Sequence, residues 1–405
     1  MTEGFTAGLV LPGGGARGAY QAGVLKGIAE LLPRPNRNPF RVVSGTSVGA
    51  VNAAVLASNA LRFQRGVGEL TRVWSDFRCE QVYRCGAGHL LGRSAHWLAA
   101  LTLGGFGPAA PASLLDNAPL RSLLSRYLRF ENIQRAIKAG ALDAVSVTAS
   151  GFACARAISF FQGKEELAPW IRSRRAGVRA ELDLDHLMGS VAVPFIFPTA
   201  TIGSEHFGDG AMREATPLSP ALHLGADRLL VIGVRDERPM PPGEDAGPPP
   251  RFGEIAGYML DTVFLDGLFA DLERMTRVNH MLERTGPIMD KDRQRLLRPV
   301  ALHLIVPSED IREIAYRHSE AFPRAMRTLL RGVGALKDSR SQLNSYLLFE
   351  RAYTRELIEL GYRDALDQAE SLRAFFTEKS IPMLTAPDYL ERALERHALP
   401  AGGDS

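Results

Sequence analysis

Short apolar runs rich in β-branched residues alternate with segments of helical periodicity along most of this chain. The apolar runs that predict buried strands lie at residues 6–11, 41–44, 142–150, 227–234 and 300–306. Apolar residues recur at helical spacing over residues 18–32, 48–57, 62–74, 117–138, 254–285 and 309–378. The first two strands are each followed by a helix. This order predicts an α/β fold whose strand-to-helix loops meet at one edge of a parallel sheet.

Two stretches interrupt the alternation. Residues 62–140 are less regular and contain the almost uncharged, glycine-rich tract 86–112, so we interpret them as an insertion that covers the functional site. Residues 236–252 hold six prolines among charges and glycines and predict an extended loop or linker. We expect a main domain over residues 1–320 and a helical C-terminal extension over residues 321–405.

Composition and charge exclude several classes of protein. The formal net charge of +3 is too small to indicate nucleic acid, and it permits a membrane surface without indicating one. Cys79, Cys85 and Cys154 lack metal-ligand spacing and indicate a reducing compartment. The first five residues lack the pattern of a signal peptide, and Gly and Pro interrupt the uncharged tract 94–115. We therefore expect a cytoplasmic protein without a transmembrane helix, peripheral to a membrane at most.

A serine between two glycines stands where the second strand turns into a helix. The pentapeptide GTSVG at residues 45–49 has the form of a nucleophile elbow, in which a tight turn exposes the hydroxyl of Ser47. The free N–H groups and the dipole of the following helix favour an oxyanion beside that serine. Taken alone, the pentapeptide also fits an ordinary turn that joins a strand to a helix.

Two further turns contain candidate functional residues. The loop GGGARG at residues 13–18 follows the first strand and exposes backbone N–H groups, while Arg17 either anchors this loop or meets a phosphate. Asp209 lies between two glycines, so it can approach a reacting group closely. His206 is the histidine nearest to Asp209 in sequence and would suit a triad, although a surface or packing position is the simpler interpretation.

In this order, the loop at 13–18, the elbow at 45–49 and Asp209-Gly210-Ala211 resemble the motifs of the patatin-like phospholipase family. The resemblance covers residues 6–58 and 142–235. It implies a three-layer α/β/α sandwich with a mainly parallel sheet, in which residues 1–320 form the catalytic domain. It also implies a lipid acyl hydrolase that needs no cofactor or metal, with phospholipid or lysophospholipid as the first choice of substrate.

The resemblance further implies a Ser47–Asp209 dyad. Asp209 would accept the proton of Ser47, Ser47 would attack an ester carbonyl, and water would hydrolyse the acyl-enzyme. A free aspartate titrates near ~3.9, so burial would have to raise the pKa of Asp209. The N–H groups expected to bind the oxyanion belong to Gly13, Gly14, Gly15 and Val48. The expected supporting residues are Arg17, Gly45, Gly49 and Gly210.

Two other interpretations stay open. A lipid-binding or regulatory protein on the same scaffold would have lost catalysis. The spacing of Gly13, Gly15 and Gly18 also fits the dinucleotide fingerprint of an oxidoreductase, but residues 42–44 hold no acidic side chain at the expected distance of about ~20 positions. The sequence indicates neither an oligomeric state nor the headgroup and acyl length of a lipid.

Trp97 tests whether the apolar tract 86–115 packs as ordinary core or opens as a cover onto a bilayer. As a cover, Trp97→Ser is expected to lower turnover of vesicle phospholipid much more than turnover of a soluble short-chain ester, because an indole suits the membrane interface. The melting temperature should change little. Equal losses on both substrates, or a large fall in melting temperature, would favour the packing role.

Overall fold

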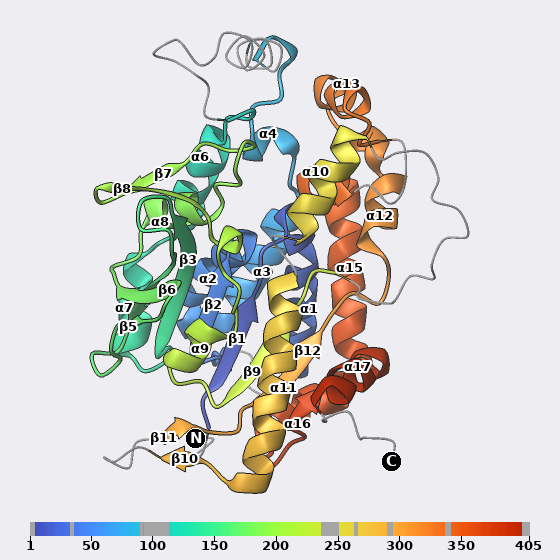
Figure 1. Ribbon diagram of the computed structural model, residues 1–405. Coiled ribbons are helices and arrows are strands. Elements are labelled where there is room, and N and C mark those ends of the chain that lie inside the picture. The colour runs from blue at the N-terminus through green and yellow to red at the C-terminus, as the bar shows by residue number, and fades with distance from the viewer. Residues whose placement is uncertain are drawn as a thin grey trace.

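The computed structural model describes residues 5–32, 36–89, 92, 113–235, 251–262, 266–289, 295–336 and 342–398. One large sheet runs through the molecule, with helices on both of its faces (Figure 1). In sheet order its strands are β13 (Leu384–Thr385), β12 (Ala301–Ile305), β9 (Arg228–Ile232), β1 (Ala7–Leu11), β2 (Val42–Thr46), β3 (Ala144–Gly151), β4 (Ala157–Gly163), β6 (Arg175–Arg179) and β5 (Trp170–Ile171). The pairs from β13 to β3 are all parallel, which confirms the mainly parallel α/β sandwich expected from the sequence.

Both faces of the central strands are buried. Leu9 and Val43 join a hydrophobic cluster with α1 (Gly18–Leu31) and α2 (Val48–Ser58). Val10 and Val42 join a second cluster with α9 (Ser219–His223) and α11 (Gly267–Thr285). Because side chains alternate between the two faces, a strand covered on both sides favours apolar residues at consecutive positions. This is why these strands are recognisable in the sequence as continuous apolar runs.

The remaining elements include short strands and helices that the sequence pattern left undivided. Residues 117–138 form two helices rather than the single one expected, because Leu128 leaves helical geometry at ψ 134° and buries its side chain. The other strands are β7 (Ala200–Ile202), β8 (Glu205–Asp209), β10 (Ile288–Met289) and β11 (Arg295–Leu297). The other helices are α3 (Phe63–Ser75), α4 (Cys79–Val82), α6 (Ala118–Tyr127), α7 (Glu131–Lys138), α8 (Leu184–Ser190), α10 (Phe252–Asp261), α12 (Ile311–Arg317), α13 (Arg324–Gly332), α14 (Gln342–Leu347), α15 (Arg351–Asp367), α16 (Ala369–Thr377) and α17 (Asp388–Ala398).

Helix α15 packs closely along α1, although more than 300 residues separate them in sequence. A Cβ atom at Gly23 would lie 2.1 Å from the Ile358 carbonyl oxygen, and one at Gly361 would lie 2.3 Å from the Tyr20 carbonyl oxygen. The Tyr20 hydroxyl also donates a hydrogen bond of 2.8 Å to Asp364. The C-terminal helices therefore pack directly on the sandwich, while the expected domain boundary near residue 320 stays a prediction.

Two expected features fall wholly or partly on residues that are not described. Trp97 and the rest of 93–112 lie outside the described residues, and so do residues 236–250 of the proline-rich segment. The interpretation of these segments as a cover and a linker therefore stays a prediction. Among the described helices, none is both long and apolar enough to cross a membrane.

Candidate active site

Ser47 stands between β2 and α2 in a strained turn. Its φ of 54° lies in the left-handed region that residues with a Cβ atom rarely adopt. The two flanking glycines are required by space, because a Cβ atom at Gly49 would lie 1.9 Å from the Leu11 carbonyl oxygen. A Cβ atom at Gly45 would lie 2.3 Å from the Gly49 carbonyl oxygen. The turn thus has the geometry expected of a nucleophile elbow.

Ser190 forms a hydrogen bond with the backbone of this turn. The sequence analysis did not identify it as a residue of the site. The backbone N–H of Ser47 donates a hydrogen bond of 2.8 Å to Ser190 Oγ, and Ser190 Oγ donates one of 2.7 Å to the Thr148 carbonyl oxygen. Ser190 is fully buried at the end of α8. No motif in the sequence marks it, because its partners lie 143 and 42 residues away.

Asp209 is fully buried at the end of β8, which pairs with β3 next to the elbow strand. Its Oδ1 atom accepts a hydrogen bond of 3.0 Å from the Ala211 N–H. Its Oδ2 atom is buried and has no hydrogen-bond partner among the described residues. Gly210 next to it is required by space, because a Cβ atom there would lie 2.2 Å from the Thr148 carbonyl oxygen.

Burial raises the pKa of Asp209 to about 7. The nearby Ser47 hydroxyl and the Ala211 N–H oppose this rise, whereas the charge of Glu214 adds to it. Ser47 is therefore close enough to influence the carboxyl group, although its hydroxyl does not form a hydrogen bond with the buried Oδ2 atom. Such bonds are often long in unliganded active sites and shorten when substrate binds.

Glu214 is a second acid in this region that the sequence analysis did not single out. It accepts a short hydrogen bond from the Thr46 hydroxyl, directly before Ser47. Burial of its carboxyl group raises its pKa to about 7, although hydrogen bonds from Thr46 and Thr148 oppose the shift. The charge of Glu214 raises the pKa of Asp209, and the charge of Asp271 raises the pKa of Glu214 in turn.

The glycine loop lies on the other side of the elbow. Among the described residues, none accepts a hydrogen bond from the backbone N–H groups of Gly14, Gly15 or Val48. Gly15 and Val48 line the same pocket as Ser47, while Gly13 is buried behind them. Gly15 has a φ of 56°, and a Cβ atom there would lie 2.3 Å from the Tyr346 carbonyl oxygen. Helix α14 is thus packed directly against the loop.

Arg17 forms its hydrogen bonds with side chains of the protein itself. It is buried and donates to Asp261 at 3.1 Å, to Gln342 at 3.2 Å and to Ser345 at 2.8 and 2.9 Å. Its guanidinium group also stacks over the Tyr346 ring at 4.2 Å. Of the two roles that the sequence left open for Arg17, this geometry favours anchoring of the loop over contact with a phosphate.

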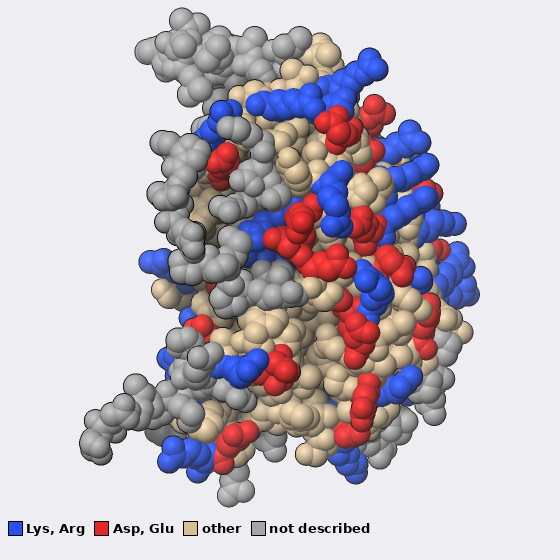
Figure 2. Space-filling view, turned by 90° about the vertical axis from the view of Figure 1, so that its right-hand side faces the viewer, with Lys and Arg blue, Asp and Glu red and all other residues tan. Residues whose placement is uncertain are grey.

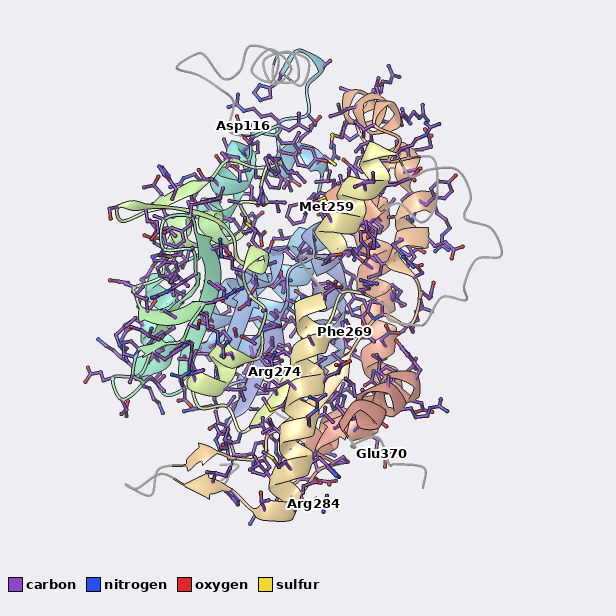
Figure 3. All side chains as sticks on the ribbon, in the orientation of Figure 1. Asp116, Met259, Phe269, Arg274, Arg284 and Glu370 are labelled. Carbon is purple, nitrogen blue, oxygen red and sulfur yellow. The ribbon has the colours of Figure 1, made fainter. Side chains whose placement is uncertain are left out.

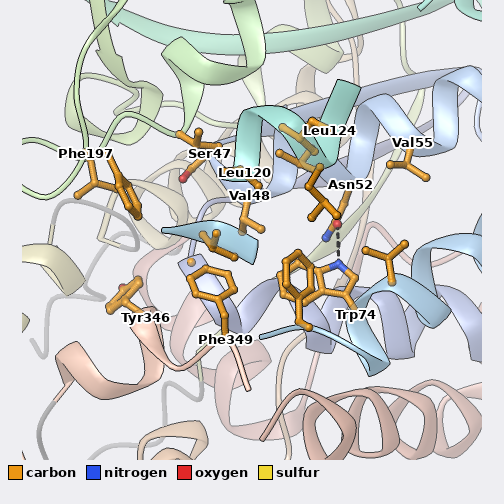
Figure 4. A pocket seen from close by; sticks show the side chains of 18 of the residues that line it. Ser47, Val48, Asn52, Val55, Trp74, Leu120, Leu124, Phe197, Tyr346 and Phe349 are labelled. Atoms are coloured by element: carbon orange, nitrogen blue, oxygen red, sulfur yellow. Dashed lines mark hydrogen bonds between the residues drawn. The ribbon is translucent and has the colours of Figure 1, made fainter. Parts of the chain in front are cut away.

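An apolar pocket extends from Ser47 along one side of α2 (Figure 4). Its wall continues over α3, α6, the segment 191–197 and the end of α14, and it encloses about 1070 Å³ of empty space, including the part open to solvent. Asn52 is polar but satisfied, since its amide oxygen accepts a hydrogen bond of 3.0 Å from the Trp74 indole. The labelled apolar side chains of the pocket are Val48, Val55, Leu120, Leu124, Phe197 and Phe349.

His206 lies away from this arrangement. It is exposed on the β7–β8 hairpin, and its Nδ1 atom is 3.2 Å from the Thr201 hydroxyl. Three residues along a strand separate it from Asp209, which corresponds to about 10 Å and to the opposite face. The structure therefore does not bring His206 to the Ser47 hydroxyl.

Comparisons with known proteins identify the family of this chain. The family model of patatin-like phospholipases matches residues 9–222, slightly more than half of the chain. A cUMP-AMP-activated phospholipase of Escherichia coli is 51% identical over 49 residues, which span 12% of this chain and only 15% of that protein. VipD from Legionella pneumophila aligns over 88% of this chain and 67% of its own at 14% identity, with a TM-score of 0.28. The chain thus belongs to the patatin-like phospholipase family.

Proposed function

We propose that this protein is a serine hydrolase that cleaves carboxylic ester bonds of lipids, with Ser47 as nucleophile and Asp209 as base. Membership of the family supports hydrolysis of lipid acyl esters in general. The observation that carries the finer proposal is a buried aspartate, with its pKa raised to about 7, beside a strained serine at the end of an apolar pocket. General bases act best when their pKa lies near the working pH.

The chemistry needs two residues and the neighbouring backbone. Ionised Asp209 removes the proton of Ser47 through Oδ2, the carboxyl oxygen that has no partner among the described residues. The serine oxygen then attacks the ester carbonyl, and the alcohol leaves with the proton that Asp209 carries. Water, activated by the same carboxylate, hydrolyses the acyl-enzyme. The N–H groups of Gly14, Gly15 and Val48 would bind the oxyanion of each tetrahedral intermediate.

The pocket supports a lipid substrate with an unbranched acyl chain. Val48, Val51 and Val55 line it at helical spacing, so its wall along α2 runs about 12 Å from the serine at ~1.5 Å per residue. An apolar channel of this kind favours a hydrocarbon chain. Among the described residues that line it, none carries a positive charge that could bind a phosphate group. The headgroup would then remain outside, which suits phospholipids and lysophospholipids alike.

Ser47→Ala is expected to lower kcat for a soluble ester by at least about 10³-fold, because the nucleophile is removed. A fluorophosphonate probe should label the native protein and not this variant. Ser58→Ala, at the other end of the same helix, is the matched control and should keep both activity and labelling. Undiminished hydrolysis by pure Ser47→Ala protein would contradict the proposal. Unlabelled, inactive native protein would favour a lipid-binding role.

Asp209→Asn should be nearly as inactive as the serine variant, because an amide cannot accept the serine proton. The amide has the same shape, so the melting temperature should stay close to that of the native protein. His206→Ala should retain full activity, since the ring is exposed on the opposite face of the hairpin. If His206→Ala were as inactive as Ser47→Ala, the dyad would have to give way to a triad.

The pH profile reports on the carboxyl pair. We expect kcat/KM for a soluble ester to fall as the pH drops through about 7, because Asp209 becomes protonated and loses its function as a base. Glu214→Gln should shift the midpoint to lower pH, because the charge of Glu214 raises the pKa of Asp209. Glu359→Gln on the exposed side of α15 is the control. An unchanged midpoint, or a shift to higher pH, would argue against the coupling.

A further inference from the structure

Helix α10 is packed with its small residues inward. A Cβ atom at Gly253 would lie 2.8 Å from the Val333 carbonyl oxygen, and one at Gly257 would lie 3.0 Å from the Leu343 N–H. These two glycines, one helical turn apart, let α10 lie directly on α14 and on the end of α13. The inner face of the helix therefore has no room for larger side chains.

Three large apolar side chains of α10 instead face solvent. Ile255 is 46% exposed, Tyr258 is 69% exposed and Met259 is 63% exposed. A surface helix of a globular protein normally shows the reverse pattern, with polar residues outward. Figure 3 shows Met259 on α10 in the upper part of the molecule, the end at which α4, α6 and α13 also lie. A cluster of this kind indicates an interaction surface.

The exposed face of α10 belongs to a helix that also contributes to the pocket of the candidate site. Leu260 follows Met259 directly and lines the apolar pocket. Asp261 comes next and is buried, where it binds Arg17 at 3.1 Å and Arg235 at 2.7 Å. The helix is thus fixed beside the glycine loop. On another part of the pocket wall, Phe195 is 70% exposed and precedes the lining residue Ile196.

Basic residues accompany this apolar face. Arg251 is exposed at the start of α10, and a Cβ atom at Gly334 would lie 2.6 Å from its Cδ atom. Helix α13 ends beside it and carries three arginines, Arg324, Arg327 and Arg331. Two carboxylates lie among these cations: Glu320 binds Arg327 and Arg331, and Glu254 on α10 accepts a hydrogen bond from the Arg251 N–H. Figure 2 shows Lys and Arg side chains gathered at the upper end of this side of the molecule, where α13 lies in Figure 1.

We propose that the outer face of α10, formed by Ile255, Tyr258 and Met259, docks on the surface of an anionic phospholipid bilayer. Exposed aliphatic and aromatic side chains next to arginines are the combination that binds anionic lipid interfaces. Docking on this face would bring the pocket, which Leu260 of the same helix lines, close to the bilayer that supplies the acyl chain. The biological role of this docking rests on the proposed lipid hydrolase function. Binding to the bilayer can nevertheless be measured without any hydrolysis.

A second copy of this chain fits the face less well than a bilayer does. A twofold dimer through α10 would bring the same surface of both copies together, and with it the two groups of arginines. Like charges that approach in this way repel each other. A bilayer with anionic headgroups offers the opposite charge and an apolar layer at the same time.

The test uses Ser47→Ala protein, so that the vesicles stay intact while binding is measured. Sedimentation with phosphatidylcholine vesicles, with and without phosphatidylglycerol, gives the partition coefficient. Adding Tyr258→Ser and Met259→Ser should lower partitioning onto the anionic vesicles about tenfold or more, because apolar area no longer enters the interface. Adding Arg324→Gln and Arg331→Gln should remove the preference for phosphatidylglycerol. Met281→Ser with Tyr316→Ser, exposed elsewhere, is the matched control.

In protein that retains Ser47, the Tyr258→Ser/Met259→Ser pair should hydrolyse a soluble short-chain ester at the native rate and vesicle phospholipid several-fold more slowly. Partitioning equal to that of the control, or indifferent to phosphatidylglycerol, would overturn the docking proposal. A native dimer that the pair converts to a monomer would also overturn it, in favour of a second copy. Failure of the proposed function has a different signature, which is normal vesicle binding without hydrolysis of any ester.

Discussion

A buried ion pair between Arg17 and Asp261 ties together the parts of the chain that surround the candidate site. Two charges in the interior cost desolvation free energy, which is offset only where geometry and further hydrogen bonds are favourable. Here the guanidinium group donates to three different side chains and stacks on Tyr346, while Asp261 also accepts from the Tyr346 hydroxyl at 3.0 Å. The glycine loop, α10 and α14 therefore depend on one another for their positions.

This dependence connects the reaction site with the surface around it. Tyr346 contributes its carbonyl group to the contact with Gly15 and its ring to the pocket wall. Asp261 ends the helix whose outer face we propose as the lipid-docking surface. A displacement of α10 at a bilayer would therefore reach the loop that we expect to bind the oxyanion. Oxyanion donors are effective when they are held in place before the reaction.

The same principle of burial governs the candidate base. Enclosing Asp209 in the protein disfavours its charge, and the neighbouring Glu214 disfavours it further. An ordinary exposed aspartate would be too weak a base near neutral pH. The fold thus places Asp209 in an environment that disfavours its ionised form, and this is why its pKa is raised. In the proposed mechanism this removes the need for a histidine between the acid and the serine.

Sequence alone determined the features that depend on local backbone geometry. The central strands were recognisable because burial on both faces favours apolar runs. The turns at Ser47 and Asp209 were recognisable by their glycines, and at Gly45, Gly49 and Gly210 there is no space for a Cβ atom. Ser190, Glu214 and the partners of Arg17 left no such signal, since these contacts join residues far apart in the chain and depend on side-chain position. The apolar outer face of α10 was equally hidden, because a helical apolar pattern does not tell which side is covered. Tertiary packing determined these contacts and the exposed face of α10. It brings segments more than 100 residues apart in sequence within hydrogen-bond distance.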